Sequence, residues 1–303
     1  MKSVLAFCLM ELLLMSDTIQ AAEYEVITRA NIEYVQHDGT ALAGDLYLPK
    51  GIDKAPVLVA VHGGGWQGSS RANYQYWGPY LAKNGYAVFA ISYRLAKPKA
   101  KTFPAAVYDV KAAVQFVRAK AGELGVDPDR IGAIGDSAGA HLASLTALAG
   151  SEPLFSAEYR NDPHASVSAS VKAVVGIYGV YDMQAQWEHD QLTRPHDQIT
   201  ETFIGAPPTA NRRSYFDASP TSYATSDKNR TRFLLVYGTA DDVVDYKTQS
   251  ERFLLSLKQA RFFVRSVVIP GGPHFWISDP VEEAGSIGSQ VGPRMLRFLA
   301  SSL

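Results

Sequence analysis

Gly135-Asp136-Ser137-Ala138-Gly139 is the stretch of sequence that decides the fold. It follows a short apolar run at residues 131–134 and opens an Ala- and Leu-rich segment at about 138–148, so it joins a predicted strand to a predicted helix. A serine at so tight a turn presents its hydroxyl outward, and only glycine two residues before and two after it avoids a clash. The positive end of the helix dipole then faces any negative charge that develops there. The pattern predicts that Ser137 is a nucleophile at the end of a strand.

Apolar runs and helical periodicity alternate on both sides of this turn. Buried strands are predicted at residues 56–61, 86–92, 171–178, 233–237 and 263–269, with helices within 104–124 and at about 288–303. Residues 24–50 are typical of antiparallel strands around a polar turn at His37-Asp38-Gly39-Thr40. Alternating strands and helices predict an α/β fold, a mostly parallel sheet covered by helices on both faces. Sites in such sheets lie at the carboxyl ends of the strands.

One stretch departs from this alternation. Residues at about 184–231 contain Pro195, Pro207, Pro208 and Pro220, many polar residues and only short apolar runs. A loop this long inside a compact domain is usually functional. We therefore expect an excursion above the sheet that forms part of a substrate pocket.

A second glycine-rich turn, His62-Gly63-Gly64-Gly65-Trp66, directly follows the strand predicted at 56–61. Consecutive glycines allow backbone N–H groups to point into a cavity, which is what an oxyanion hole requires. Gly63, Gly65 and Gly68 also fit the G-x-G-x-x-G pattern of dinucleotide-binding sites. That pattern needs a helix here and an acidic residue about 20 positions further on, and residues 83–95 contain neither Asp nor Glu. The sequence favours the oxyanion hole.

A nucleophilic serine needs a base, and the base needs an acid to orient it. Of seven histidines, His274 alone follows the last predicted strand, within a Gly-Gly-Pro-His loop beside the end of the sheet. Asp241 and Asp242 follow the strand at 233–237, and either side chain is placed to serve as the acid. The order Ser, Asp, His along the chain is the one expected for an α/β-hydrolase.

Composition narrows the class of protein. The chain has 303 residues, of which 47% are hydrophobic and 19% charged, so it is not a disordered protein. With 29 basic and 30 acidic residues, the net charge of −1 gives no reason to expect a nucleic-acid partner. Cys8 is the single cysteine, which excludes an intramolecular disulfide and a cysteine-based zinc site. We expect neither a metal nor a cofactor.

The first 22 residues have the features of a secretory signal. A lysine at position 2 precedes an apolar run, and Ala21-Ala22 supplies small residues at a cleavage site. The run is too short to span a membrane. We expect residues 23–303 to form a single domain that is secreted or periplasmic. The alternative is a cytoplasmic protein with an apolar N-terminal helix.

These motifs, together with Tyr93-Arg94-Leu95 and Gly238-Thr239-Ala240-Asp241, resemble the α/β-hydrolase superfamily. The resemblance covers about residues 30–303 and is to carboxylesterases with an HGGG turn, those related to hormone-sensitive lipase and the acetyl-xylan and feruloyl esterase-like branch. It implies that Asp241 is the acid and that the amides of Gly64, Gly65 and Ala138 bind the oxyanion. It also implies that His62 holds the glycine turn by hydrogen bonding. Many such lipases carry a helical cap before the core, whereas only the strands of 24–50 precede it here, so we expect an open, shallow site.

The resemblance implies a serine carboxylic-ester hydrolase that cleaves small or aromatic-acid esters through an acyl-enzyme intermediate. Its partner would be a small-molecule ester. Aromatic side chains near the predicted site are candidates for the pocket wall: Trp66, Tyr93, Phe275 and Trp276. An amide-bond hydrolase of the aryl formamidase or peptidase kind has the same motifs. A non-catalytic binding protein on the same fold is a third hypothesis.

Overall fold

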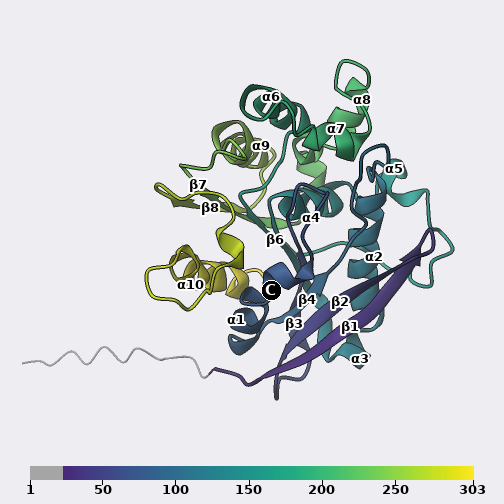
Figure 1. The fold of residues 1–303 in the computed structure, drawn as a ribbon. Helices are drawn as coiled ribbons and strands as arrows, with labels where there is room; N and C mark the ends of the chain where they lie inside the picture. The colour runs from purple at the N-terminus through teal and green to yellow at the C-terminus, as the bar shows by residue number, and fades with distance from the viewer. Residues whose placement is uncertain (1–22) are drawn as a thin grey trace, which may run out of the picture.

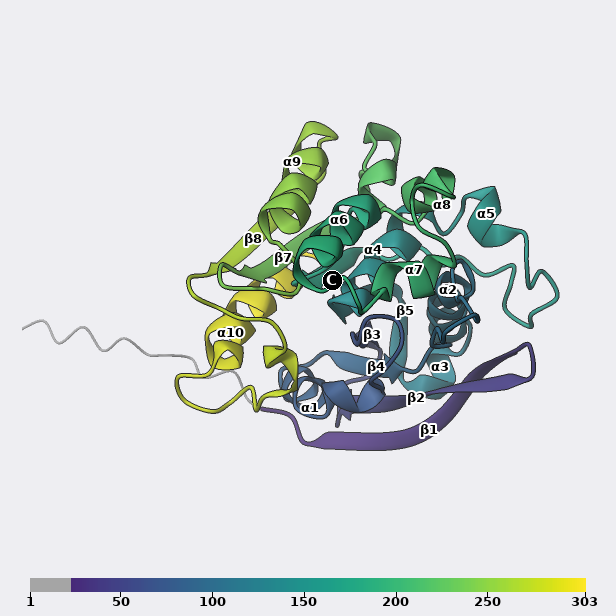
Figure 2. The same cartoon turned by 45° about the horizontal axis from the view of Figure 1, so that its top comes forward.

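The computed structural model describes residues 23–303, and Figures 1 and 2 show their arrangement. The secretory signal predicted over residues 1–22 lies outside the described residues. The described residues form an eight-stranded sheet in the order β1-β2-β4-β3-β5-β6-β7-β8. The strands are β1 (Val26–His37), β2 (Thr40–Pro49), β3 (Ala55–Val61), β4 (Ala87–Ile91), β5 (Val126–Asp136), β6 (Ala173–Ile177), β7 (Arg232–Gly238) and β8 (Val264–Ile269).

The pairs β1–β2 and β2–β4 are antiparallel, whereas β4, β3, β5, β6, β7 and β8 pair with one another in parallel. The two antiparallel strands are joined by Asp38 and Gly39, and both residues have positive φ (49° and 76°). Positive φ at both central positions is the geometry of a type I′ hairpin turn, which suits the right-handed twist of the strands. The predicted α/β sheet with an antiparallel N-terminal pair is confirmed.

Helices cover both faces of the sheet (Figure 1). Along β3, Val57, Val59 and Val61 join one apolar cluster and Leu58 and Ala60 the other. This two-residue alternation is the pleat of a strand that is buried on both sides. The helices that share the first cluster are α2 (Ala105–Ala119), α4 (Ala138–Ala149) and α9 (Arg252–Gln259), and those that share the second are α1 (Trp77–Lys83) and α10 (Ile287–Ala300).

The stretch expected to be a long loop is largely helical. It contains α6 (Met183–Thr193), α7 (Ile199–Ile204) and α8 (Arg212–Asp217), followed by 3-10 helices at Pro220–Tyr223 and Ser226–Lys228. These elements lie together beside α4 in both views (Figures 1 and 2). The remaining helical elements of the described residues are short: α3 (Ala121–Leu124), α5 (Pro153–Ser156), 3-10 helices at Arg71–Tyr74 and Trp276–Ser278, and a π-helical turn at Lys247–Glu251. Nothing helical among the described residues has the length and apolar character needed to cross a bilayer.

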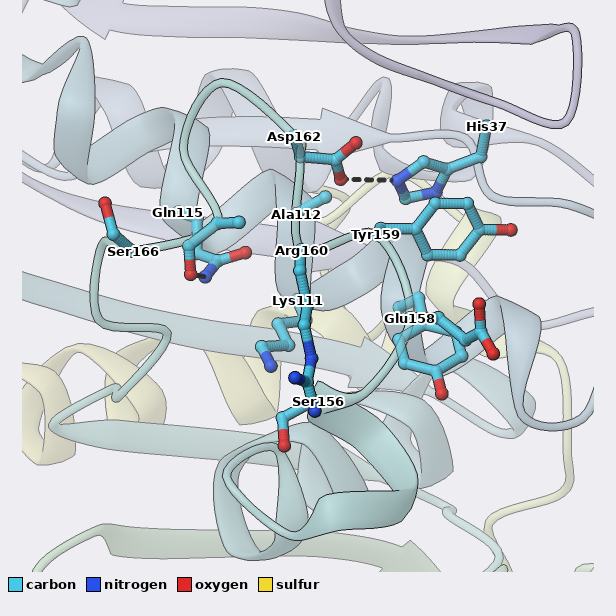
Figure 3. A pocket seen from close by; sticks show the side chains of 12 residues that line it. His37, Lys111, Ala112, Gln115, Ser156, Glu158, Tyr159, Arg160, Asp162 and Ser166 are labelled. Atoms are coloured by element: carbon cyan, nitrogen blue, oxygen red, sulfur yellow. Dashed lines mark hydrogen bonds and ion pairs between the residues drawn. The ribbon is translucent and has the colours of Figure 1, made fainter.

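A buried charged cluster fixes the β1–β2 hairpin to the rest of the protein. His37 is fully buried, with Nδ1 at 2.7 Å from Asp109 Oδ1 and Nε2 at 2.8 Å from Asp162 Oδ2. Its ring stacks on Tyr159, and Figure 3 shows His37, Tyr159 and Asp162 beside a cavity of about 200 Å³. Arg94 forms an ion pair with the same Asp109 at 2.7 Å. Since ionised carboxylates only accept hydrogen bonds, both ring nitrogens of His37 carry protons.

His37→Leu is expected to lower the free energy of unfolding by about 1–3 kcal/mol near pH 6, because the buried Asp109 carboxylate loses one of its two cationic partners and keeps only Arg94. Burial lowers the pKa of His37, but its hydrogen bonds to Asp109 and Asp162 outweigh burial and raise it. A raised histidine pKa stabilises the fold at low pH, and this contribution is lost as the pH rises through the folded pKa. Urea unfolding of both proteins at pH 6 and pH 9 measures the difference, which should be smaller at pH 9.

The exposed His196 supplies the matched control. His196→Leu should change the free energy of unfolding by less than about 0.5 kcal/mol at either pH. An equal loss in both variants would contradict the role assigned to the cluster.

Candidate active site

Ser137 occupies a strained turn between β5 and α4. Its backbone angles are φ 50° and ψ −119°, and its N–H donates to the carbonyl oxygen of Ile177 on the neighbouring strand at 2.8 Å. A Cβ atom on Gly135 would overlap the backbone of Gly139, and one on Gly139 would overlap the carbonyl of Val61. The two glycines are therefore required by the close packing of helix against sheet, as the sequence pattern predicts.

His274 and Asp241 approach Ser137 from the loops after β8 and β7. His274 Nε2 is 3.1 Å from Ser137 Oγ, and His274 Nδ1 is 2.7 Å from Asp241 Oδ2. Since a carboxylate accepts, Nδ1 carries the proton and Nε2 is left to accept from the serine hydroxyl. Both side chains are about 1% exposed. The structure thus brings the three predicted residues into one continuous line of hydrogen bonds.

The loop after β7 distinguishes the two aspartates that the residues alone leave open. Asp241 Oδ1 accepts from the backbone N–H groups of Val243 and Val244, both at 2.9 Å. These two bonds fix the carboxylate, and its other oxygen accepts from His274 and orients the ring. Asp242 is exposed, and its carbonyl oxygen rather than its carboxylate lies near His189, at 3.2 Å. Only Asp241 contacts the histidine beside Ser137.

The turn at residues 62–66 places backbone amides next to Ser137. Gly64 and Gly65 have φ of 102° and 59°, and both line the same cavity as Ser137 and Ala138. Within residues 23–303, the N–H groups of Gly64, Gly65 and Ala138 donate to no protein acceptor. Three unpaired amides beside one hydroxyl can stabilise an anion that forms there.

Asp136 connects the serine turn to the glycine turn. Its carboxylate is buried next to Ser137, and Oδ1 accepts from the N–H of Gly63 at 3.0 Å. Burial raises the pKa of Asp136 to about 7, although the hydrogen bond from Gly63 opposes this. A protonated or weakly ionised carboxyl at this position holds the amide turn without placing a full charge beside the serine.

Neutral histidines hold the same turn from the other side. His62 Nδ1 lies 2.7 Å from the carbonyl oxygen of Gly63, to which it donates, and its ring stacks on Tyr93. Tyr93 Oη donates to the carbonyl oxygen of His62 at 2.9 Å. Burial lowers the pKa of His62 to about 4, so the ring is uncharged near neutral pH. Tyr93, a predicted pocket residue, instead supports the backbone beneath the turn.

Trp66 is tied to α4 and to the excursion. Its Nε1 donates to His141 Nδ1 at 3.0 Å, and His141 Nε2 donates in turn to the carbonyl oxygen of Ala218 at 2.7 Å. Burial lowers the pKa of His141 to about 4, which fits a ring that accepts on one nitrogen. Trp66 also stacks on Phe203 of α7, with ring centroids 4.7 Å apart. These contacts hold Trp66 in place as part of the cavity wall.

The cavity at Ser137 has a volume of about 170 Å³. Of the four candidate aromatic residues, Trp66 and Phe275 line it, whereas Tyr93 and Trp276 do not. Trp276 packs against Trp77 and Tyr178 on the opposite face of the sheet, where it is 3% exposed. The remaining wall comes from residues that the sequence pattern does not single out: Val180, Gln186, Asp190, Arg194, Ile199, Val243 and Val244.

Tyr178 is a further residue that sequence reasoning misses. It follows β6 with a positive φ of 37°, and its ring centroid lies 4.2 Å from that of His274. The only signal in the sequence is its place at the end of the strand predicted at 171–178. The helical residues of the cavity wall have a clearer signal, because Gln186, Asp190 and Arg194 repeat at intervals of four.

A nucleophile turn between a parallel strand and a helix, with a histidine and an aspartate after later strands, defines an α/β-hydrolase. The BD-FAE family model matches residues 44–257, and the chain belongs to this family. LipM of Mycobacterium tuberculosis, named a probable carboxylic ester hydrolase, is 35% identical over 207 residues, which are 68% of this chain and 45% of LipM. This chain spans about half the length of the curated relatives that it matches first.

Solved structures of esterases have the same fold. The butyrate-bound form of a thermophilic esterase from Thermogutta terrifontis has a TM-score of 0.72 and 25% identity, covering 92% of this chain and 94% of that one. A bifunctional GH43-CE protein of Bacteroides eggerthii has a TM-score of 0.76 and 27% identity, covering 91% of this chain and 35% of that one.

The free energy of unfolding of Asp136→Asn, measured relative to that of the unsubstituted protein, is expected to increase as the pH rises. The folded state keeps a proton on Asp136 that the unfolded state releases, so stability falls as the pH rises from about 4 to 7. Asparagine removes this titration and keeps an oxygen for the Gly63 N–H. Urea unfolding at pH 5 and pH 8 should show the difference between the two proteins shift by about 2 kcal/mol in favour of the variant. The same difference at both pH values would refute the raised pKa.

Proposed function

We propose that the protein is a serine carboxylic-ester hydrolase that forms an acyl-enzyme on Ser137. The observation that carries the proposal is the hydrogen-bonded line from Ser137 through His274 to Asp241, next to three unpaired amides. The esterase names of LipM and of the Thermogutta terrifontis structure support an ester as the substrate.

Acylation begins when His274 Nε2 takes the proton of the Ser137 hydroxyl as Oγ attacks the ester carbonyl carbon. The carbonyl oxygen becomes an oxyanion and accepts from the amides of Gly64, Gly65 and Ala138. Each such donor contributes about 3–4 kcal/mol to the stability of the transition state. The His274 imidazolium is stabilised by the buried Asp241 side chain, which bonds its Nδ1.

The tetrahedral intermediate collapses when His274 donates its proton to the alcohol oxygen and the ester C–O bond breaks. Water then enters, gives a proton to His274 and attacks the acyl carbon. His274 returns that proton to Ser137 Oγ as the acid leaves.

The size of the cavity favours small acyl groups. Its volume of about 170 Å³ is below the roughly 300–1,000 Å³ of pockets that hold drug-sized ligands. Val180, Ile199 and Val244 give part of the wall an apolar surface suited to a short chain. The butyrate bound to the Thermogutta terrifontis esterase is a ligand of this size.

Ser137→Ala and His274→Ala are each expected to lower kcat on p-nitrophenyl butyrate at least ~10⁴-fold, because either change removes the nucleophile or its base. Asp241→Ala and Asp242→Ala form a matched pair of adjacent carboxylates. Asp241→Ala should lower kcat by about 10⁴-fold, and Asp242→Ala by less than about threefold, since only Asp241 contacts His274. A larger loss of kcat in Asp242→Ala than in Asp241→Ala would show that Asp242 is the acid of the triad.

The value of kcat/KM should depend strongly on the length of the acyl chain. We expect kcat/KM for p-nitrophenyl acetate and butyrate to exceed that for the dodecanoate at least about tenfold, because the long chain cannot enter the cavity. A panel of p-nitrophenyl esters measured at equal enzyme concentration gives the comparison. Equal or rising kcat/KM up to the dodecanoate would show that the acyl chain binds elsewhere.

Two results would replace the proposed class. Faster turnover of p-nitroacetanilide than of p-nitrophenyl acetate would make the protein an amide-bond hydrolase. Failure of a fluorophosphonate probe to label Ser137, together with no turnover of any ester, would leave a binding protein on a hydrolase fold. Labelling that is abolished in Ser137→Ala supports the esterase.

A further inference from the structure

One aromatic side chain lies at the opening of the cavity at Ser137. Phe275 lines the cavity and is 65% exposed, whereas Val180 and Val244, which line it too, are 3% and 2% exposed. The other exposed residue of the lining is Gly64, which has no side chain. Phe275 is therefore the side chain of the cavity wall that is most open to solvent, and the hydrolysis mechanism makes no use of it.

The backbone of Phe275 has a conformation that bulky residues rarely adopt. Its angles are φ 68° and ψ 8°, in the left-handed region that glycine reaches without steric cost. Because the ring is mostly exposed, its burial does little to offset this strain, and the stability of the fold does not explain a phenylalanine here. Residues held in such conformations cluster at functional sites. The strain at Phe275 thus points to a role in binding.

The ring of Phe275 packs against the base of the triad. Its centroid lies 4.5 Å from that of His274, and the two ring planes are at 90°, an edge-to-face arrangement. Among residues 23–303, no second aromatic ring packs against Phe275. The ring therefore has one neighbour in the catalytic machinery and a large apolar surface that faces solvent beside it.

The reaction determines which part of an ester comes next to this ring. In the proposed mechanism the carbonyl oxygen faces the amides of the glycine turn, and His274 Nε2 gives its proton to the alcohol oxygen. The alcohol oxygen must therefore lie within hydrogen-bonding distance of His274, and the rest of the alcohol continues from that point. The acyl chain extends toward the buried apolar wall, at Val180 and Val244. The alcohol is thus the part of the ester that comes beside Phe275.

We infer that Phe275 is a specificity-determining residue that binds the alcohol part of the ester, and that the enzyme prefers esters of apolar alcohols that carry an aromatic ring. The inference deepens the proposed function and rests on it. A phenylalanine ring has no hydrogen-bonding atom, so a polar alcohol that covers it loses hydration and gains no bond in return. An aromatic ring loses apolar contact with water and gains a ring–ring contact as well.

Benzyl acetate and ethyl acetate test the preference. Both give the same acetyl-enzyme and differ only in the alcohol, so the ratio of their kcat/KM values compares the two alcohols during acylation. Acid release followed by pH-stat titration gives kcat/KM for each ester. The unsubstituted enzyme should prefer benzyl acetate at least about fivefold, as expected for one aromatic pair together with the apolar surface that it buries.

In Phe275→Ala the preference should fall to about twofold or less, and because it is a ratio within one variant, a general loss of activity does not affect it. Phe275→Gly should lose the preference equally. Since glycine suits the positive φ, the midpoint of its urea unfolding should be no lower than that of the unsubstituted protein. Phe216 on α8 is the matched control, because it is 53% exposed and lies outside the lining of the cavity. Phe216→Ala should keep the full preference.

The outcomes separate the two proposals. If neither acetate is hydrolysed, the proposed function itself fails. If both are hydrolysed without a preference for benzyl acetate, the role of Phe275 is wrong and the esterase stands. A preference that survives unchanged in Phe275→Ala and Phe275→Gly overturns the assignment to this residue. The ratio of kcat/KM for methyl butanoate to that for methyl acetate should be the same in Phe275→Ala as in the unsubstituted enzyme. A change in that ratio, with the benzyl preference intact, would place the ring against the acyl chain and overturn the inference.

Discussion

The amino end of α4 is wedged against the ends of β3, β5 and β6, and this steric constraint sets the geometry of the site. Gly139 has no room for a side chain because the carbonyls of Val61 and His62 occupy that space. The unusual backbone angles of Ser137 persist because its N–H is bonded to Ile177 on the adjacent strand. Because helix and strands come this close, the serine and the amides of the glycine turn line the same cavity.

The sequence was sufficient to predict the parts of the structure that have local causes. The runs that became β3 and β4 are apolar throughout because both faces are covered, and the glycines at 135 and 139 are explained by one close contact. The acid was ambiguous because Asp241 and Asp242 are adjacent in a loop. Which carboxylate faces His274 depends on the amides of Val243 and Val244, and no periodicity in the sequence encodes a loop conformation.

The four prolines of the excursion favour irregular structure, whereas the structure has short helices there. Pro195 follows α6, Pro207 and Pro208 separate α7 from α8, and Pro220 opens a 3-10 helix. Proline is tolerated between helices and at their first turn, so these residues punctuate short helices. Two of the helices have only six residues, too few to show a clear amphipathic pattern or to be stable alone. These helices form because they pack beside α4. The sequence pattern does not predict them, and so it does not predict the residues of the excursion that line the cavity.

His141 connects the glycine turn to the excursion through one side chain and one backbone carbonyl. Trp66 donates to the ring, and the ring donates to the carbonyl oxygen of Ala218. Because every residue type has such a carbonyl, the excursion can change its side chains without breaking this link. The excursion, which borders the cavity, can therefore change in sequence while the glycine turn keeps its position. Within a family built on this arrangement, new specificities can accumulate by substitution on the excursion helices, whereas insertions or deletions near Ala218 would disturb the amides themselves.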